Sequence, residues 1–284
     1  MQICRCFTDI RSTVSAWRQA GLGVVFVPTL GNLHDGHLQL VNLGKQHGER
    51  VVVSIFVNPL QFGKNEDYSL YPRTLDADIE KLASIGTDAL FCPSDQEIYP
   101  NGVEYQTTVA VPTMTDILCG ATRPGHFTGV TTIVSKLFNI VQPDKAVFGV
   151  KDFQQLAIVK RMVEDMCFPI EIIEAPVARA DDGLALSSRN GYLNKAERTQ
   201  APLLQQTLSR ARALILGGER NYALVEARAK VNLLEGGLRP DYFSVRCAKT
   251  LEPASMPDLE LVILAAAYLG RTRLIDNVTL ALKA

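Results

Sequence analysis

The stretch "GVVFVPTLGNLHDGHLQL", residues 23–40, decides the fold class. Its first five residues are apolar and mostly β-branched, which predicts a buried strand. The chain then turns through two glycines, and apolar residues recur at helical spacing from about Gly36, beginning with Leu38 and Val41. A strand that leads through a glycine-containing turn into a helix is typical of α/β folds, in which ligands bind at this turn.

The same alternation continues through the first two thirds of the chain. Uninterrupted apolar strands in β-α-β-α order indicate a parallel sheet that is covered by helices on both faces. We expect strands over 51–57, 88–92, 145–150 and 170–177, and helices over 74–85, 129–141 and 153–166.

The pattern changes after about residue 177. A long polar-patterned segment predicts two helices within 195–235, followed by strands over 242–246, 259–269 and 272–280. This order is typical of an α+β unit. We therefore expect a first domain over 1–176, a hinge within 175–183 and a smaller second domain over 177–284.

The composition is that of an ordinary globular protein, with 284 residues, 47% hydrophobic and 21% charged. A formal net charge of −1 argues against a general nucleic-acid-binding surface, although a local cluster of donors could still bind a small anion. The six cysteines form no C-x-x-C motif, which favours reduced thiols over a disulfide framework. The N-terminal residues lack a signal-peptide pattern and the longest apolar run is too short to cross a bilayer, so we expect a cytoplasmic protein.

His34 and His37 are the strongest candidates for chemistry. Residues three apart at the start of a helix lie on the same face, and both rings can donate hydrogen bonds to phosphate oxygens. Gly31 and Gly36 allow a ligand to approach the backbone, and we expect the backbone N–H groups of this turn to point at it. The alternatives are two surface histidines or a metal pair, for which the sequence offers no obvious third ligand. Phosphate binding is the favoured interpretation.

Further polar residues follow other predicted strands. Asn58 and Gln61 could orient a small polar substrate, or they could simply cap a turn, and their residue types leave both open. Lys151 could meet phosphate charge, or it could be a solvated residue at a helix start with Asp152 as the N-cap. Of the neighbouring Gln154 and Gln155, only one should face the site, because they differ by about 100° around a helix.

Two loops carry additional charged and hydroxyl groups. Ser187, Ser188 and Arg189 could form an anion clamp, or the serines could cap a helix. Arg123 and His126 precede an apolar helix, and their residue types leave functional and structural roles equally open.

The form H-x-G-H after a first strand resembles the signature of the nucleotidylyl-transferring superfamily with Rossmann-like folds. The motifs taken together resemble the pantoate–β-alanine ligase family, also called pantothenate synthetases, over nearly the whole chain. They are, in order, "VPTLGNLHDGH", "SIFVNPLQF", "YPRTLDAD", "RPGHFTGVTTIVSKLFNIVQPD", "KDFQQL" and "DGLALSSRNGYL".

This resemblance implies a homodimeric cytosolic enzyme with a Rossmann-like N-terminal domain and an α+β C-terminal lid. It implies that ATP and pantoate form pantoyl adenylate with the help of Mg²⁺, and that β-alanine then displaces AMP to give pantothenate. An enzyme that makes a stable nucleotidyl product, or an inactive nucleotide-binding regulator, would share part of the pattern. AMP formation that depends on β-alanine distinguishes the three.

The resemblance also implies roles for individual residues. His34, His37 and Lys151 would be catalytic, with His37 as the proton donor, and Gln61 and Gln155 would bind pantoate or β-alanine with Asn58 nearby. The ATP site would comprise Leu30, Gly31, Asn32, Leu33, His34, Asp35, Gly36, His37, Gly149, Val150, Lys151, Asp152, Ala178, Leu186, Ser187, Ser188 and Arg189.

Three positions depart from the pattern that the resemblance implies. Leu30 replaces a methionine of similar volume. Val150 and Cys119 each replace a glutamate, which changes the hydrogen-bonding groups near the predicted site.

Overall fold

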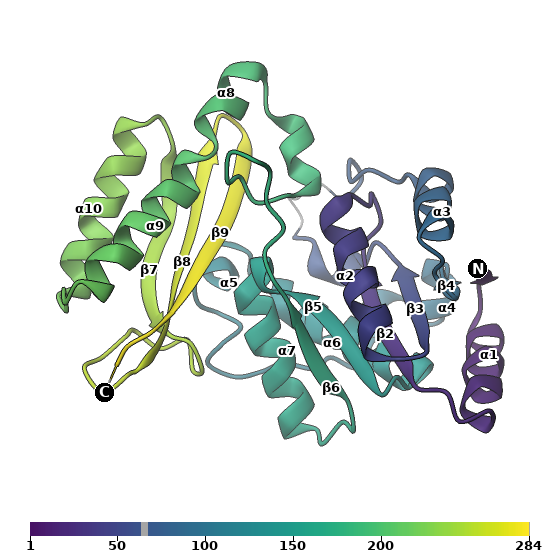
Figure 1. Ribbon diagram of the computed structural model, residues 1–284. Coiled ribbons are helices and arrows are strands. Elements are labelled where there is room, and N and C mark those ends of the chain that lie inside the picture. The colour runs from purple at the N-terminus through teal and green to yellow at the C-terminus, as the bar shows by residue number, and fades with distance from the viewer. Residues whose placement is uncertain (64–67, 284) are drawn as a thin grey trace. The chain divides into compact units, whose positions relative to one another are not determined.

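The computed structural model describes residues 1–63 and 68–283. By its internal packing the chain divides into two compact units. Residues 1–150 and 158–176 form the first unit, and residues 151–157 and 177–284 form the second. The first is built on a parallel sheet and the second on an antiparallel one (Figure 1). The predicted α/β fold class, with a separate α+β unit, is confirmed.

The sheet of the first unit is parallel, with strand order β1-β4-β3-β2-β5-β6. Every strand predicted in this part of the chain is present, and the three-residue edge strand β1 is an addition. The strands are β1 (Gln2–Cys4), β2 (Val24–Thr29), β3 (Arg50–Ile55), β4 (Ala89–Phe91), β5 (Lys145–Gly149) and β6 (Glu171–Ala175).

Alternating residues of β2 pack on the two faces of this sheet. Val25 and Val27 join a buried cluster with Val41 of α2. Phe26 points to the opposite face, where its ring lies 6.4 Å from that of Phe138 in α6. The strand is therefore apolar from Val24 to Pro28, and its last residue, Thr29, is polar. The helical elements are α1 (Phe7–Gln19), α2 (Asp35–His47), η1 (Pro59–Gln61), α3 (Leu75–Ser84), α4 (Asp95–Ile98), η2 (Val103–Tyr105), α5 (Cys119–Thr122), α6 (His126–Val141), η3 (Val150–Asp152) and α7 (Phe153–Asp165).

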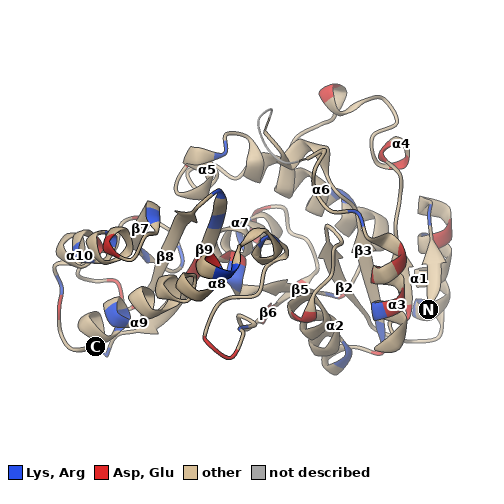
Figure 2. Cartoon of the chain, turned by 90° about the horizontal axis from the view of Figure 1, so that it is seen from above, with Lys and Arg blue, Asp and Glu red and all other residues tan. Residues whose placement is uncertain are grey.

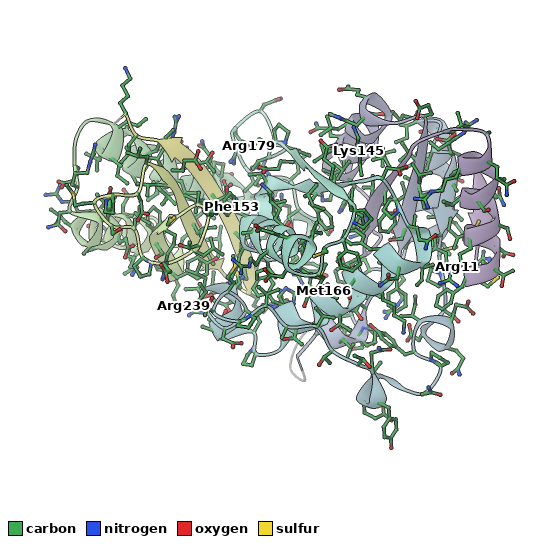
Figure 3. The ribbon with its side chains drawn as sticks, turned by 90° about the horizontal axis from the view of Figure 1, so that it is seen from below. Arg11, Lys145, Phe153, Met166, Arg179 and Arg239 are labelled. Atoms are coloured by element: carbon green, nitrogen blue, oxygen red, sulfur yellow. The ribbon has the colours of Figure 1, made fainter. Side chains whose placement is uncertain are left out.

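The second unit packs helices on a three-stranded sheet of order β7-β8-β9. Leu208 and Leu233 from the helices share a buried cluster with Phe243 and Ile263 from the strands. Arg239, labelled in Figure 3, lies over the ring of Tyr268 at 4.4 Å. The elements are η4 (Ser188–Tyr192), α8 (Lys195–Gln200), α9 (Leu203–Leu216), α10 (Tyr222–Glu235), β7 (Arg239–Cys247), β8 (Glu260–Leu269) and β9 (Thr272–Ala281).

The parallel pairing brings the predicted site segments of the first unit to one edge of its sheet. Thr29 ends β2 opposite Ile55 at the end of β3, and Phe56 N donates to the Thr29 carbonyl at 3.1 Å. Residues 30–37 and 58–61 therefore leave the sheet from neighbouring carboxyl ends, where open α/β sheets bind ligands.

Acidic and basic residues are interspersed along the helices, for example on α3 (Figure 2). In the parts of the chain that the structure describes, no helix is long and apolar enough to cross a membrane.

Candidate functional site

The two histidines of the 30–37 turn form a reciprocal cap at the start of α2. His34 is the N-cap residue, and its Nδ1 accepts a hydrogen bond from Gly36 N at 3.1 Å. His37 Nδ1 accepts from His34 N at 3.3 Å, and the two rings lie 4.2 Å apart. Because both Nδ1 atoms accept, each neutral ring carries its proton on Nε2. The pair is thus fixed as two Nε2–H donors.

The backbone N–H groups of this turn bond mostly to the protein itself. Gly31 N donates to Thr29 Oγ1 at 3.2 Å, and Asn32 N and Leu33 N each donate to Asp78 at 2.8 Å. The expectation that the turn points these amides at a ligand is therefore wrong. The side chains of this corner are therefore the main candidate donors for an anion, with the positive end of the α2 dipole behind them.

Asp78 is the residue that the sequence analysis missed at this corner. Its carboxylate is fully buried, and it also accepts from Thr74 Oγ1 at 3.1 Å. One turn further along α3, Lys81 Nζ donates to the Leu33 carbonyl at 2.6 Å. Gly31 and Asn32 both have positive φ, 83° and 50°, a conformation that L side chains rarely adopt. Helix α3 therefore holds the turn in this conformation through both the amides and a carbonyl.

Asn58 and Gln61 are brought together after β3. Asn58 is fully buried, and its Nδ2 donates to Gln61 Oε1 at 3.2 Å and to the Gly129 carbonyl at 3.1 Å. Its Oδ1 accepts from Tyr99 Oη at 2.6 Å and from Leu60 N at 3.3 Å. Both donors and both acceptor positions of the amide are used, so Asn58 orients Gln61 rather than a ligand. Gln61 in turn keeps its Nε2 donor directed away from Asn58.

Tyr99 supplies the donor that sets the orientation of the Asn58 amide. Burial raises the pKa of the Tyr99 phenol above its ordinary value, so the hydroxyl stays protonated and donates. This residue precedes no recognisable motif, and nothing in the sequence around it indicates its role.

His126 and Arg123 fix the backbone of Gln61. Arg123 Nη1 lies 2.9 Å from His126 Nε2, and His126 Nδ1 lies 2.7 Å from the Gln61 carbonyl. A guanidinium can only donate, so Nε2 accepts, the ring is neutral and Nδ1–H donates to the carbonyl. Of the two roles that their residue types left open, the structure shows a structural one for this pair.

The remaining predicted residues follow β5 in the chain. Lys151 Nζ is 3.5 Å from Asp152 Oδ2, and its side chain is 19% exposed. Leu186 N donates to the Ala178 carbonyl at 2.9 Å, which places these two predicted nucleotide-binding residues side by side. Ser187 Oγ accepts from Arg189 N at 3.2 Å and so caps η4, as one of the two interpretations expected.

Gln155 is partly exposed on α7, whereas Gln154 is only 4% exposed. This difference agrees with the expectation that one of the two glutamines is available to a ligand. Val150 and Cys119, the positions that depart from the expected glutamates, are respectively half-buried and buried.

Over residues 1–63 and 68–283 no three His, Cys, Asp or Glu side chains form a group that could hold a metal ion. The two His34 and His37 Nδ1 atoms are occupied by backbone N–H groups. The metal-pair interpretation of these histidines therefore has no support in the geometry.

Comparison with known proteins identifies the family. The family described as Pantoate-beta-alanine ligase matches residues 2–279. The chain belongs to this family. A pantothenate synthetase of Saccharophagus degradans is 53% identical over 99% of this chain and 99% of its own. The resemblance inferred from the sequence, and with it the assignment as a ligase, is confirmed.

Solved structures of family members agree with this fold. The crystal structure of pantothenate synthetase from Thermus thermophilus has a TM-score of 0.89 and 42% identity, covering 98% of this chain and 99% of that one. A Francisella tularensis pantoate-beta-alanine ligase, described as complexed with beta-gamma ATP and beta-alanine, has a TM-score of 0.79 and 33% identity, covering 98% and 97%.

Proposed function

We propose that this chain condenses pantoate with β-alanine at the expense of ATP, giving pantothenate, AMP and pyrophosphate through pantoyl adenylate. The observation that carries the proposal is the reciprocal histidine cap at the carboxyl edge of the parallel sheet, in a chain about half identical to pantothenate synthetases.

In the first step a pantoate carboxylate oxygen attacks the α-phosphorus of ATP, and the bond to pyrophosphate breaks. The carboxylate is already ionised at neutral pH, so the protein needs no base for this step. The Nε2–H groups of His34 and His37 donate to phosphate oxygens, and the Lys151 and Arg189 cations offset the charge that develops on pyrophosphate. The resemblance makes His37 the proton donor.

In the second step the neutral amine of β-alanine attacks the acyl carbonyl, the acyl C–O bond to AMP breaks, and the attacking nitrogen releases a proton to solvent as the amide forms. Gln61 and Gln155 orient pantoate by hydrogen bonds, while Asn58 and Tyr99 hold the Gln61 amide in one orientation. The other residues that the resemblance places in the ATP site bind the nucleotide. Residues 177–284 act as a lid over it.

Mg²⁺ fits this site as part of MgATP. The ion prefers oxygen ligands and commonly binds substrate phosphates with few protein carboxylates, so the phosphates of ATP would supply most of its ligands. When bound, it neutralises phosphate charge. We further propose a cytoplasmic homodimer that does not bind nucleic acid.

The test measures AMP release by the purified protein with ATP, pantoate and β-alanine, omitting each in turn. We expect exchange of labelled pyrophosphate into ATP to require pantoate but not β-alanine. Pantothenate formation should require both. Pantothenate formation without any exchange would contradict the adenylate mechanism. Absence of both would favour an inactive nucleotide-binding protein.

A further inference from the structure

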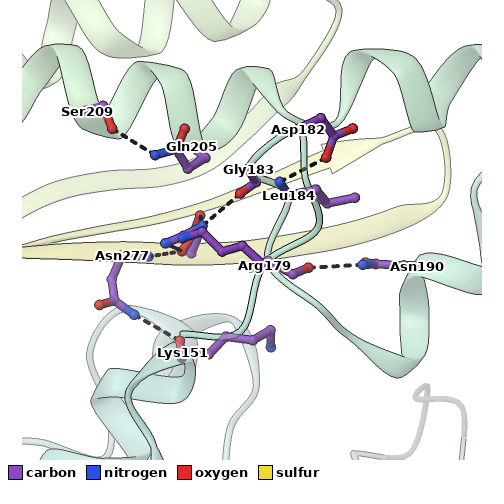
Figure 4. Close-up of polar contacts among 11 residues, drawn as sticks. Lys151, Arg179, Asp182, Gly183, Leu184, Asn190, Gln205, Ser209 and Asn277 are labelled. Carbon is purple, nitrogen blue, oxygen red and sulfur yellow. Dashed lines mark hydrogen bonds and ion pairs between the residues drawn. The ribbon is translucent and has the colours of Figure 1, made fainter. Parts of the chain in front are cut away.

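Two adjacent side chains on β9, Asp276 and Asn277, contact the segments that carry the predicted nucleotide-binding residues of the second unit (Figure 4). Asp276 is 4% exposed and Asn277 is 2% exposed. Burying a polar side chain costs folding free energy unless the side chain is hydrogen-bonded. The hydrogen bonds of these two residues therefore contribute to the stability of the fold.

Asp276 forms a two-pronged ion pair with Arg179. The two terminal nitrogens of the guanidinium lie 2.6 and 2.9 Å from the two carboxylate oxygens. Arg179 Nη1 also donates to the Gly183 carbonyl at 3.0 Å. A planar guanidinium that is held at both ends is fixed in direction as well as in position. The ion pair therefore ties the 179–183 loop to β9.

The same loop joins the predicted nucleotide-binding residues on either side of it. Leu186 N donates to the Ala178 carbonyl at 2.9 Å, and Ala180 N donates to the Leu184 carbonyl at 2.9 Å. The two arms of the loop are thus paired, and Ser187 to Arg189 follow directly. Fixing Arg179 consequently fixes both arms.

Asn277 holds a different segment of the chain. Its Nδ2 donates to the Lys151 carbonyl at 3.0 Å, where η3 leads into α7. The bond sets the backbone from which the Lys151 ammonium extends.

We propose that Asp276 and Asn277 are positioning residues for nucleotide binding, which fix the 178–189 loop and Lys151 respectively. This inference rests on the proposed function. Neither residue touches the reacting atoms; each acts through the residues that it holds.

The test uses Asp276→Asn and Asn277→Ala in the full chain, with titration calorimetry of α,β-methylene-ATP in the presence of MgCl₂ and, separately, of pantoate. Each variant loses a buried hydrogen bond to a positioned group, so we expect the dissociation constant for the nucleotide to rise about tenfold or more. The dissociation constant for pantoate should stay within about twofold.

Asp241→Asn is the matched control. Asp241 on β7 pairs with Arg273 on β9 at 2.7 and 3.0 Å, a partly buried ion pair that joins two strands of the same sheet. We expect this variant to lose thermal stability as Asp276→Asn does and to bind the nucleotide like the wild type. A nucleotide affinity that is unchanged in both test variants, or equally weakened in the control, would overturn the inference. A wild-type chain that binds no nucleotide would overturn the proposed function and the inference with it.

Discussion

At the scale of single residues, Asp78 accepts hydrogen bonds from the backbone N–H groups of Asn32 and Leu33. In a glycine-rich turn without this carboxylate, those groups could donate to a phosphate. Asp78→Asn retains one acceptor oxygen and turns an N–H group toward one of these amides. Leaving a buried donor unsatisfied costs about 1–3 kcal/mol. We expect the turn to relax and the KM for ATP to rise about tenfold, with the KM for pantoate nearly unchanged.

Steady-state kinetics with each substrate varied in turn measures this effect. Asp76→Asn serves as the control, because Asp76 is exposed on the same helix and should tolerate the change. Wild-type kinetics in Asp78→Asn would show that the turn keeps its conformation without the carboxylate.

Gln61 is oriented by a chain of hydrogen bonds that begins at Tyr99. Tyr99→Phe removes only the hydroxyl, so Asn58 Oδ1 loses one of its two donors and the Asn58 amide holds Gln61 less firmly. We expect weaker pantoate binding by about three- to tenfold, the effect of losing one hydrogen bond, and unchanged ATP binding. Calorimetric titration with pantoate and with ATP measures both affinities. Tyr105→Phe is the control, because Tyr105 is 78% exposed. Equal losses for both ligands would make Tyr99 a general structural residue.

The site residues that stand in recognisable patterns, such as His34 and His37, could be identified from the sequence. Asp78 was missed although a signal exists, since Asp78 shares the buried face of its helix with Leu75, Ile79 and Leu82 at helical spacing. A carboxylate on an apolar helix face needs a buried partner. Tyr99 could not be found in this way, because its partner Asn58 lies 41 residues away in the sequence.

At the scale of elements, the contact between α6 and η1 depends on Gly129. A Cβ at this position would lie 2.2 Å from the Leu60 carbonyl oxygen and 2.6 Å from Gln61 N, both backbone atoms that cannot move without shifting η1. Gly129→Ala should therefore lower the melting temperature and raise the KM for pantoate, even though alanine favours helix by about 1 kcal/mol.

Gly44→Ala is the control for helix propensity. It is a buried glycine within α2, and the nearest atom that its added Cβ would meet is a side-chain methyl of Val25 at 3.3 Å. Thermal unfolding and kinetics of both variants test the contact. A Gly129→Ala protein as active and as stable as the wild type would contradict it.

Elements with a long apolar pattern were predictable, since burial on both faces leaves an uninterrupted run such as that of β2. The edge strand β1 was not, because two of its three residues are exposed and it contains no run at all. Helix α1 was missed as well, since its buried positions are few and its apolar residues are separated by charges. The short helices α4 and α5 have only four residues each, too few to show a helical repeat of apolar residues, although Ser94 caps α4 locally by accepting from Glu97 N at 3.2 Å.

At the scale of the whole molecule, the thiol pKa and the reactivity of the buried cysteines should change when the protein unfolds. Burial raises the pKa of the Cys4 and Cys92 thiols, so the folded protein carries less thiolate at these positions than the unfolded chain. Above the ordinary thiol pKa of about 8.5 the unfolded chain binds fewer protons than the folded one, so these groups lower stability as the pH rises.

We expect Cys167, which is exposed, to react rapidly with a disulfide reagent near pH 8, and Cys4 and Cys92 to react only on unfolding. Peptide mapping of the labelled protein over a urea series measures this. Rapid labelling of Cys4 or Cys92 without denaturant would contradict the tight packing of the β1 and β4 edge of the sheet.

In the reciprocal cap the two ring nitrogens of each histidine have different functions. Nδ1 accepts a backbone hydrogen bond that caps α2, and Nε2–H is the donor proposed for the substrate. His37→Ala would remove both nitrogens at once. A loss of activity in that variant could then come either from the lost helix cap or from the lost hydrogen bond to the substrate. The carboxamide oxygen of asparagine occupies roughly the place of Nδ1, and the terminal nitrogen of glutamine roughly that of Nε2. His37→Asn and His37→Gln would thus divide one side chain into its folding part and its chemical part, and a comparison of the two would assign each loss to its own atom.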